Sequence, residues 1–316
     1  KWIIMNVTPD STIVLENSVI EASFFKTNST GGAIEDYTGS LSSGFNVTFK
    51  SDAGLDKVVR VIKNKARIAY TPVLDDNILK AASSDVIFEI PVEVPTIYVS
   101  TSGKNTNNGK TRETAVKDID YAVGLSQYSK IIILEGYHIL NNAFTIERDS
   151  YIIIEGEGDV IIDLMSHNIF DNSAKVKLSN LKFINGSNAD DRALMYTWNG
   201  DLGWYISLDN VEFYNNHLTH QVISSTGSKQ SVFINNCKFY NNTIDYSLGL
   251  MYVGGNTTIT NSIFKDNYNK QHNILYISAN TYGGLPVKFE IVNCTFENNR
   301  ADGGSAGISI SSNSNV

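Results

Sequence analysis

The feature that most constrains the fold is a nine-residue motif that recurs five times in the second half of the chain. Each copy reads apolar-x-Asn-x-x-Phe-x-Asn-Asn or a close variant of it. The phenylalanines are separated by 30, 26, 25 and 32 residues, and they are Phe183, Phe213, Phe239, Phe264 and Phe296. A period of this length indicates a solenoid in which every repeat forms one coil, rather than a closed globular domain.

Each motif position has a physical interpretation. The leading apolar residue and the phenylalanine are expected to point into the core, because alternate residues of a strand share one face. The asparagine at the third position is expected at a two-residue corner, since asparagine tolerates a left-handed backbone at modest cost. We expect the stacked corner side chains to form a hydrogen-bonded ladder along the axis. These residues are Asn180, Asn210, Asn236, Asn261 and Asn293.

The two cysteines fall at equivalent inward positions, Cys237 and Cys294, with Ser262 in the repeat between them. Two coils of about 4.8 Å place their Cα atoms on the order of 10 Å apart. That separation exceeds the roughly 7 Å that a disulfide spans. We therefore expect free, buried thiols that pack as small apolar groups.

The pattern predicts an all-β chain of two domains. Residues 96–316 are expected to form a right-handed parallel β-helix, truncated at its C-terminus because the sequence ends within a repeat. A short amphipathic segment around Ala115–Val123 is expected to form a helix that covers the open first coil. Residues 1–95 show about seven short strands separated by turns, which predicts an immunoglobulin-like β-sandwich.

Charge and hydropathy exclude several classes of protein. The net charge of −8 argues against a general affinity for nucleic acid, which needs clustered Lys and Arg. No apolar run has the length of about 20 residues that a membrane-spanning helix requires. The first residues are already strand-like, so the chain is interpreted as a fragment, with any membrane or cell-wall anchor outside it. Seven Asn-x-Ser/Thr sequons, the first at Asn6, fit an exported protein.

At this point the sequence resembles known families. The segment from Ile97 through Gly109, Ala115 and Ile119 to Tyr137 is similar to the entry segment of pectate-lyase-like right-handed β-helices. The Phe-x-Asn-Asn repeats, with Gly303–Ile308, are similar to polymorphic outer-membrane-protein repeats. Together with the immunoglobulin-like domain, they resemble large adhesin-like surface proteins of methanogenic archaea. The resemblance implies an extracellular, cell-surface protein that binds another cell or a surface polymer.

Candidate catalytic and metal-binding residues are few. Lyases on this fold combine an acidic Ca²⁺ site with an Arg or Lys base, and hydrolases need two or three carboxylates. The compact acidic group is Asp190 and Asp191 beside Arg192, where a solvated turn is expected and a metal site is the alternative. His217 and His220 have a spacing that suits a metal, but no acidic or Cys ligand lies near them in the sequence. We expect no enzyme activity, no metal and no cofactor.

The remaining candidates are aromatic. Tyr196, Trp198, Trp204 and Tyr205 form a group that would stack on sugar rings or anchor a protein contact if it is exposed. The sequence therefore predicts a non-catalytic adhesin fragment whose β-helix is a rigid stalk and a ligand platform. Its expected partner is a surface glycan or protein of another cell. The alternative is a polysaccharide lyase or glycoside hydrolase on the same fold.

Overall fold

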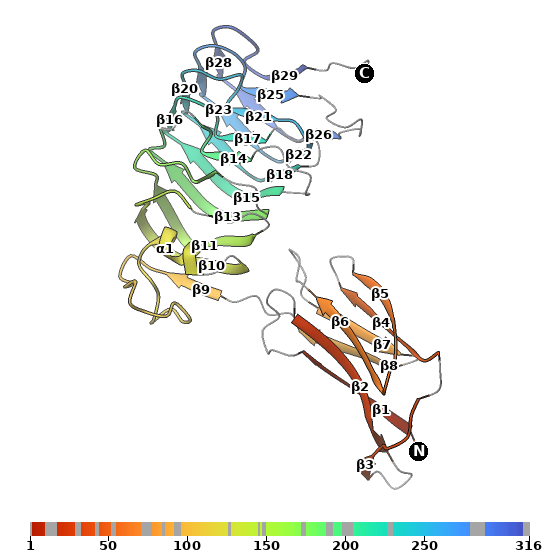
Figure 1. The fold of residues 1–316 in the computed structure, drawn as a ribbon. Helices are drawn as coiled ribbons and strands as arrows, with labels where there is room; N and C mark the ends of the chain where they lie inside the picture. Colours follow the sequence, from red (N-terminus) through yellow and green to blue (C-terminus); the bar gives the residue numbers. More distant parts are fainter. Residues whose placement is uncertain are drawn as a thin grey trace. The chain divides into compact units, whose positions relative to one another are not determined.

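A computed structural model describes most of the chain. The described residues are 2–9, 18–28, 33–41, 44–51, 55–70, 78–83, 86–91, 96–125, 128–144, 146, 150–171, 175–187, 192–197, 205–225, 230–278 and 288–311. The chain divides into two compact units, Lys1–Pro95 and Thr96–Val316 (Figure 1). The division falls at the boundary between the two expected domains.

The N-terminal unit contains two four-stranded antiparallel sheets. One sheet has the order β1-β2-β3 with β6 also paired to β2, and the other has the order β5-β4-β7-β8. The strands are β1 (Trp2–Pro9), β2 (Ser18–Asn28), β3 (Ile34–Asp36), β4 (Asn46–Ser51), β5 (Asp56–Arg60), β6 (Lys65–Tyr70), β7 (Ile78–Ser83) and β8 (Val86–Pro91). Both sheets supply one apolar core that includes Met5, Ile20, Phe24, Phe49 and Leu79. The immunoglobulin-like assignment of this unit stays a prediction.

The second unit is a parallel β-solenoid of about five turns, which confirms the repeat interpretation. Three parallel sheets run along it (Figure 1). The first contains β9 (Thr96–Val99), β10 (Tyr128–Ile139), β11 (Tyr151–Asp163), β13 (Lys175–Ile184), β15 (Tyr205–Tyr214), β18 (Ser231–Asn235), β19 (Lys238–Tyr240), β22 (Asn256–Thr260), β23 (Ile263–Lys265), β26 (Phe289–Val292) and β27 (Thr295–Glu297). The second contains β12 (Phe170–Asp171), β14 (Met195–Thr197), β17 (Ile223–Ser225), β21 (Met251–Val253), β25 (Leu275–Ser278) and β29 (Ile308–Ser311). The third contains β16 (His217–Leu218), β20 (Thr243–Ile244), β24 (Tyr268–Asn269) and β28 (Arg300–Ala301).

A short helix, α1 (Ile119–Leu125), lies in the first coil and overlaps the predicted segment around Ala115–Val123, ending two residues beyond it. It contacts β9 and β10, and its buried residues Ile119, Ala122 and Val123 belong to the solenoid core. The apolar face of the helix thus closes the region where the solenoid begins. Within the described residues, no helix combines the length and the apolar character that crossing a bilayer requires.

The motif phenylalanines form a continuous column in the core. Successive rings are in register and nearly parallel, with centroids 4.7–5.3 Å apart and interplanar angles of 3–14°. Phe183, Phe213, Phe239 and Phe264 are 0% exposed, and Phe296 in the last described coil is partly buried. The predicted inward direction of this motif position is therefore confirmed.

The third motif position forms the corner between two strands of a coil. All five corner asparagines have a left-handed backbone, with φ between 52° and 55°. In three of the four steps between them, Nδ2 of one donates to Oδ1 of the corner asparagine one coil earlier, at 2.8–3.3 Å. In the remaining step, Nδ2 of Asn261 donates instead to Oδ1 of Asn235, at 2.9 Å.

A second ladder, inside the solenoid, uses the asparagine at the last position of the second to fifth motifs. Oδ1 of Asn242 accepts from Nδ2 and the backbone N–H of Asn216, at 2.9 and 3.2 Å. Nδ2 of Asn242 donates to the carbonyl of Phe213 at 2.9 Å. Asn267 and Asn299 continue the same pattern. Carboxamides thus satisfy backbone groups at a turn that is shielded from water.

Both cysteines are free thiols, as expected from their spacing. Cys237 is 1% exposed, and burial raises the pKa of its thiol to about 12. Cys294 is only half-buried, so the expectation of burial is wrong for this residue. Its coil is the last one described, and Phe296 of the same coil is also only partly buried.

Candidate functional site

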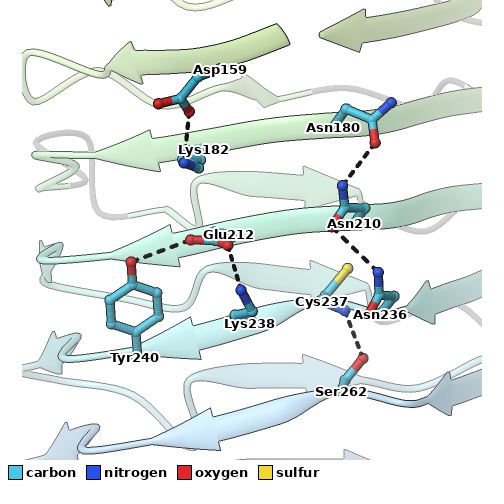
Figure 2. A network of polar contacts seen from close by, with 10 residues as sticks. All are labelled: Asp159, Asn180, Lys182, Asn210, Glu212, Asn236, Cys237, Lys238, Tyr240 and Ser262. Carbon is cyan, nitrogen blue, oxygen red and sulfur yellow. Dashed lines mark hydrogen bonds and ion pairs between the residues drawn. The ribbon is translucent and has the colours of Figure 1, made fainter. Parts of the chain in front are cut away.

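Ion pairs join adjacent coils on one outer face of the solenoid. We call this the paired-charge face, formed by the outward side chains of β13, β15, β19, β23, β27 and the second half of β11. Outward residues at one motif position lie in a row along the axis, because parallel coils repeat about every 4.8 Å. The pairs are Asp159–Lys182 at 2.6 Å, Glu212–Lys238 at 2.8 Å and Glu297–Lys265 at 2.9 Å (Figure 2 shows the first two). Opposite charges are therefore neutralised pair by pair across this face.

Two tyrosines lie beside these pairs. The rings of Tyr214 and Tyr240 are stacked with centroids 4.9 Å apart and an interplanar angle of 1°. The Tyr240 hydroxyl donates to Glu212 at 3.3 Å, so this carboxylate accepts bonds from both Tyr240 and Lys238 (Figure 2). Partial burial, and then the charge of Glu212, raises the pKa of Tyr240 to about 12. The phenol therefore stays protonated at neutral pH and remains a hydrogen-bond donor.

A depression in the paired-charge face arises from an irregular coil. In the pairing of β11 with β13, residues 156–160 lie opposite only Asn180 and Leu181. Five residues opposite two make a bulge, and Gly158 at its centre has φ +85°, a conformation that suits glycine. The depression beside this bulge has a volume of about 320 Å³, and its lining includes Asp159, Asn180 and Lys182. The depression therefore lies where this coil lacks the asparagine corner that later coils have.

The structure describes only part of the aromatic group that the sequence singled out. Tyr196 lies half-buried on the outward side of β14, and the guanidinium of Arg192 lies 5.6 Å from the centroid of its ring. Tyr205 is the first residue of β15. Trp198 and Trp204 lie outside the described residues, and so do the acidic candidates Asp190 and Asp191. Whether these residues form one site stays a prediction.

His217, one of the two histidines whose spacing suits a metal, lies beside an acidic residue. Nε2 of His217 lies 3.0 Å from Asp245, which also pairs with Lys270 at 2.6 Å. The expectation that no acidic group lies near His217 is therefore wrong, because Asp245 belongs to the next coil. Within the part of the chain that the structure describes, no group of three or more His, Cys, Asp or Glu side chains is placed to hold a metal ion.

A second, smaller depression lies in the first coils. Its volume is about 190 Å³, and its lining includes Thr101, Lys117, Asp118, Tyr137 and His138. His138 is 3% exposed and contacts the carbonyl of Leu134 through Nε2 at 2.8 Å. It is in register with Ile162, which in turn is in register with Phe183. The register position of the phenylalanine column therefore continues through Ile162 to an imidazole two coils before Phe183.

This histidine is expected to make the solenoid less stable in acid. Burial lowers the pKa of folded His138 below its ordinary value of 6.5, and the bond to Leu134 opposes this only in part. Below about pH 6.5 the unfolded chain therefore binds a proton at His138 that the folded chain does not bind. The contribution of His138 to the free energy of unfolding is fully present above about pH 6.5 and is lost as the pH falls toward the pKa of the folded state. The expected slope is at most about 1.4 kcal/mol per pH unit from this one group. Thermal unfolding between pH 7.5 and 5 should show the decline, and His138→Gln should flatten it. An unchanged profile in that variant would assign the acid sensitivity to other groups.

The paired-charge face carries a signal that could have been found in the sequence. The residue before each motif phenylalanine points outward, and in three successive repeats it is Lys182, Glu212 and Lys238. Charges of alternating sign at one repeat position predict ion pairs between coils. The bulge carries a weaker signal, the Gly-x-Gly of Gly156 and Gly158 at a place where later coils have an asparagine corner.

The chemistry available on this face is recognition by hydrogen bonds. Glu212 is held by two donors and its side chain is only 18% exposed, which leaves it poorly placed to act as a free base. Ammonium groups, phenol hydroxyls, carboxamides and the lysine-paired carboxylates of Asp159 and Glu297 are the groups that the face presents to solvent. No protein-family model, curated protein or solved structure matches the chain, so its function is inferred from these residues themselves.

Proposed function

We propose that this chain is a non-catalytic fragment of a cell-surface adhesin, in which the solenoid is a rigid platform for glycans of another cell. The observation that carries the proposal is the paired-charge face, where the acids of Asp159, Glu212 and Glu297 are each paired with a lysine. Such a face offers many fixed donors and acceptors with little net charge. Polar hydrogen bonding combined with partly exposed tyrosine rings is suited to hydroxyl-rich polymers.

The same arrangement supports binding over the alternative of polysaccharide cleavage. Glycoside hydrolysis uses a pair of carboxyl groups that flank the bond to be cleaved, one of them available as an acid. On the paired-charge face, adjacent coils place a lysine beside Asp159 and beside Glu212, so the two carboxylates do not act together. We therefore favour the adhesin over the lyase or hydrolase.

The wider identity follows from the resemblance in the sequence. We propose an immunoglobulin-like N-terminal domain, a right-handed coil, an extracellular location and an origin among the adhesin-like proteins of methanogenic archaea. Support comes from the order of the two units and from the repeated motif. The partner would be a glycan or a protein of another cell, and the anchor would lie outside this chain.

The test is a binding screen of the purified chain against a glycan array and whole cells, including uronic-acid polymers. Unsaturated products are followed by ultraviolet absorbance and reducing ends by a colorimetric assay. Glycan or cell binding without product is expected, and the double variant Tyr214→Ala/Tyr240→Ala should weaken it about tenfold or more. The matched control is the double variant Tyr252→Ala/Tyr276→Ala. The ring centroids of these two tyrosines lie 5.4 Å apart on the second sheet. Product formation would replace the adhesin with an enzyme, and equal losses in both double variants would remove the paired-charge face from the binding site.

A further inference from the structure

We propose that the depression beside the β11 bulge binds one uncharged sugar unit, as the specificity pocket of the glycan platform. This assignment rests on the proposed glycan-binding function. It goes beyond that function by naming the pocket, the charge class of the ligand and the side chains that contact it. Three observations carry it: an asparagine ladder that ends in the depression, a carboxylate oxygen beside it, and the local neutrality of the charges.

The corner ladder begins at Asn180, and only the oxygen of this first carboxamide bonds to the next corner asparagine. Oδ1 of Asn180 accepts from Asn210 at 2.9 Å (Figure 2). No described residue accepts from Nδ2 of Asn180. One coil earlier, the position opposite is Gly156, where a Cβ would lie 2.0 Å from the carbonyl oxygen of Asn180. On the backbone as it stands, a side chain does not fit at Gly156, so this coil has no corner asparagine there. The bulge replaces it and leaves the amide donors of Asn180 facing the depression.

An acceptor lies in the same depression. Oδ1 of Asp159 is paired with Lys182 at 2.6 Å, while its Oδ2 accepts from no described residue. Asp159 is on the bulge, and Asn180 and Lys182 are on β13. Sugar hydroxyls both donate and accept, so one hydroxyl of a bound sugar can donate to Asp159 while another accepts from Asn180. The buried residues Val160 and Leu181 also line the depression, beneath these polar groups.

Charge decides between neutral and acidic sugars. The nearest ammonium group, that of Lys182, is already paired with Asp159, and Glu212 is paired with Lys238. A uronate would have to compete with Asp159 for Lys182, and its carboxylate would then lie near Asp159 and Glu212. Repulsion from these two groups disfavours it. The volume of about 320 Å³ is at the lower end of ligand pockets, which fits one sugar unit rather than a buried chain.

The experiment is saturation-transfer NMR and calorimetry on the whole chain. The probes are the methyl glycosides of glucose, galactose, mannose and N-acetylglucosamine, with methyl glucuronide and methyl galacturonide as acidic counterparts. At least one neutral glycoside is expected to bind, and more tightly than either acidic one. Asn180→Gly should weaken binding roughly tenfold, as expected for one lost hydrogen bond, and Asp159→Ala should weaken it by at least as much.

Asn261→Gly is the matched control. Asn261 has the same corner position and a φ of 52°, so glycine keeps the backbone, but it lies three coils away from the depression. Unchanged binding in Asn261→Gly together with loss in Asn180→Gly supports the pocket. Tighter binding of the uronides, or equal losses in the two glycine variants, overturns it. If glycans or cells bind the chain but Asn180→Gly has no effect, the pocket fails and the platform stands. If no glycan or cell binds at all, both proposals fail.

Discussion

Replacing Phe239 with alanine is expected to lower the free energy of unfolding of the solenoid by about 4 kcal/mol. Phe239 is 0% exposed and lies in the middle of the column, with ring centroids 5.3 Å from Phe213 and 4.9 Å from Phe264. The variant loses the burial of the ring and both stacking contacts, and the regular coils on either side restrict collapse around the cavity. Urea unfolding, read by hydrogen exchange in peptides from residues 205–265, separates this unit from the N-terminal one.

The control for this variant comes from the same coil. Phe233 lies on β18, points outward and is 44% exposed, so Phe233→Ala should cost about 1 kcal/mol or less. The pair of variants compares one residue type in two directions on the same turn of the chain. Similar losses at Phe233 and Phe239 would mean that the column does not determine the stability of the solenoid.

Much of the solenoid could be predicted because the repeat specifies it several times over. The corner position shows this: Asn180, Asn210 and Asn236 share a left-handed φ that few residue types adopt, so the amino acid itself marks the turn. The phenylalanine position is as easy to interpret, because a large apolar residue that recurs in every coil is expected to be buried in the core. Five independent copies of each signal outweigh the ambiguity of any one of them.

Other features have no sequence signal or only a weak one, for physical reasons. Asn216 and Asn242 are buried, whereas the preceding residues Asn215 and Asn241 are exposed. Because both residues of each pair are asparagines, the sequence does not indicate which side chain points inward. The pairing of His217 with Asp245 depends on a register between coils whose loops differ in length. The β11 bulge depends on a pairing with β13 that shifts within the strand. The candidate depression belongs to this last class, so it arises where the repeat fails and not where it is strong.

Replacing Asn242 with alanine is expected to destabilise the solenoid about as strongly as the loss of the phenylalanine ring, by about 4 kcal/mol. Its side chain is 1% exposed and takes part in bonds to Asn216, Asn267 and the carbonyl of Phe213. Alanine removes little apolar area. The loss comes from the partners, which stay buried without a donor or an acceptor and cannot reach water. The measurement is the same urea series with hydrogen exchange in residues 205–265.

The neighbouring residue isolates this effect. Asn241 is exposed, has φ +54° and donates from Nδ2 to Asn215 at 2.6 Å, so Asn241→Gly removes a ladder bond while keeping the backbone. We expect a cost below about 1 kcal/mol, because water replaces the lost bond at the surface. Two adjacent asparagines, each in a ladder along the same axis, should thus differ several-fold in their contribution. If Asn241→Gly and Asn242→Ala lower the free energy of unfolding equally, burial of the Asn242 amide does not explain how the turn is stabilised. Both ladders would then stabilise the solenoid only by fixing the backbone.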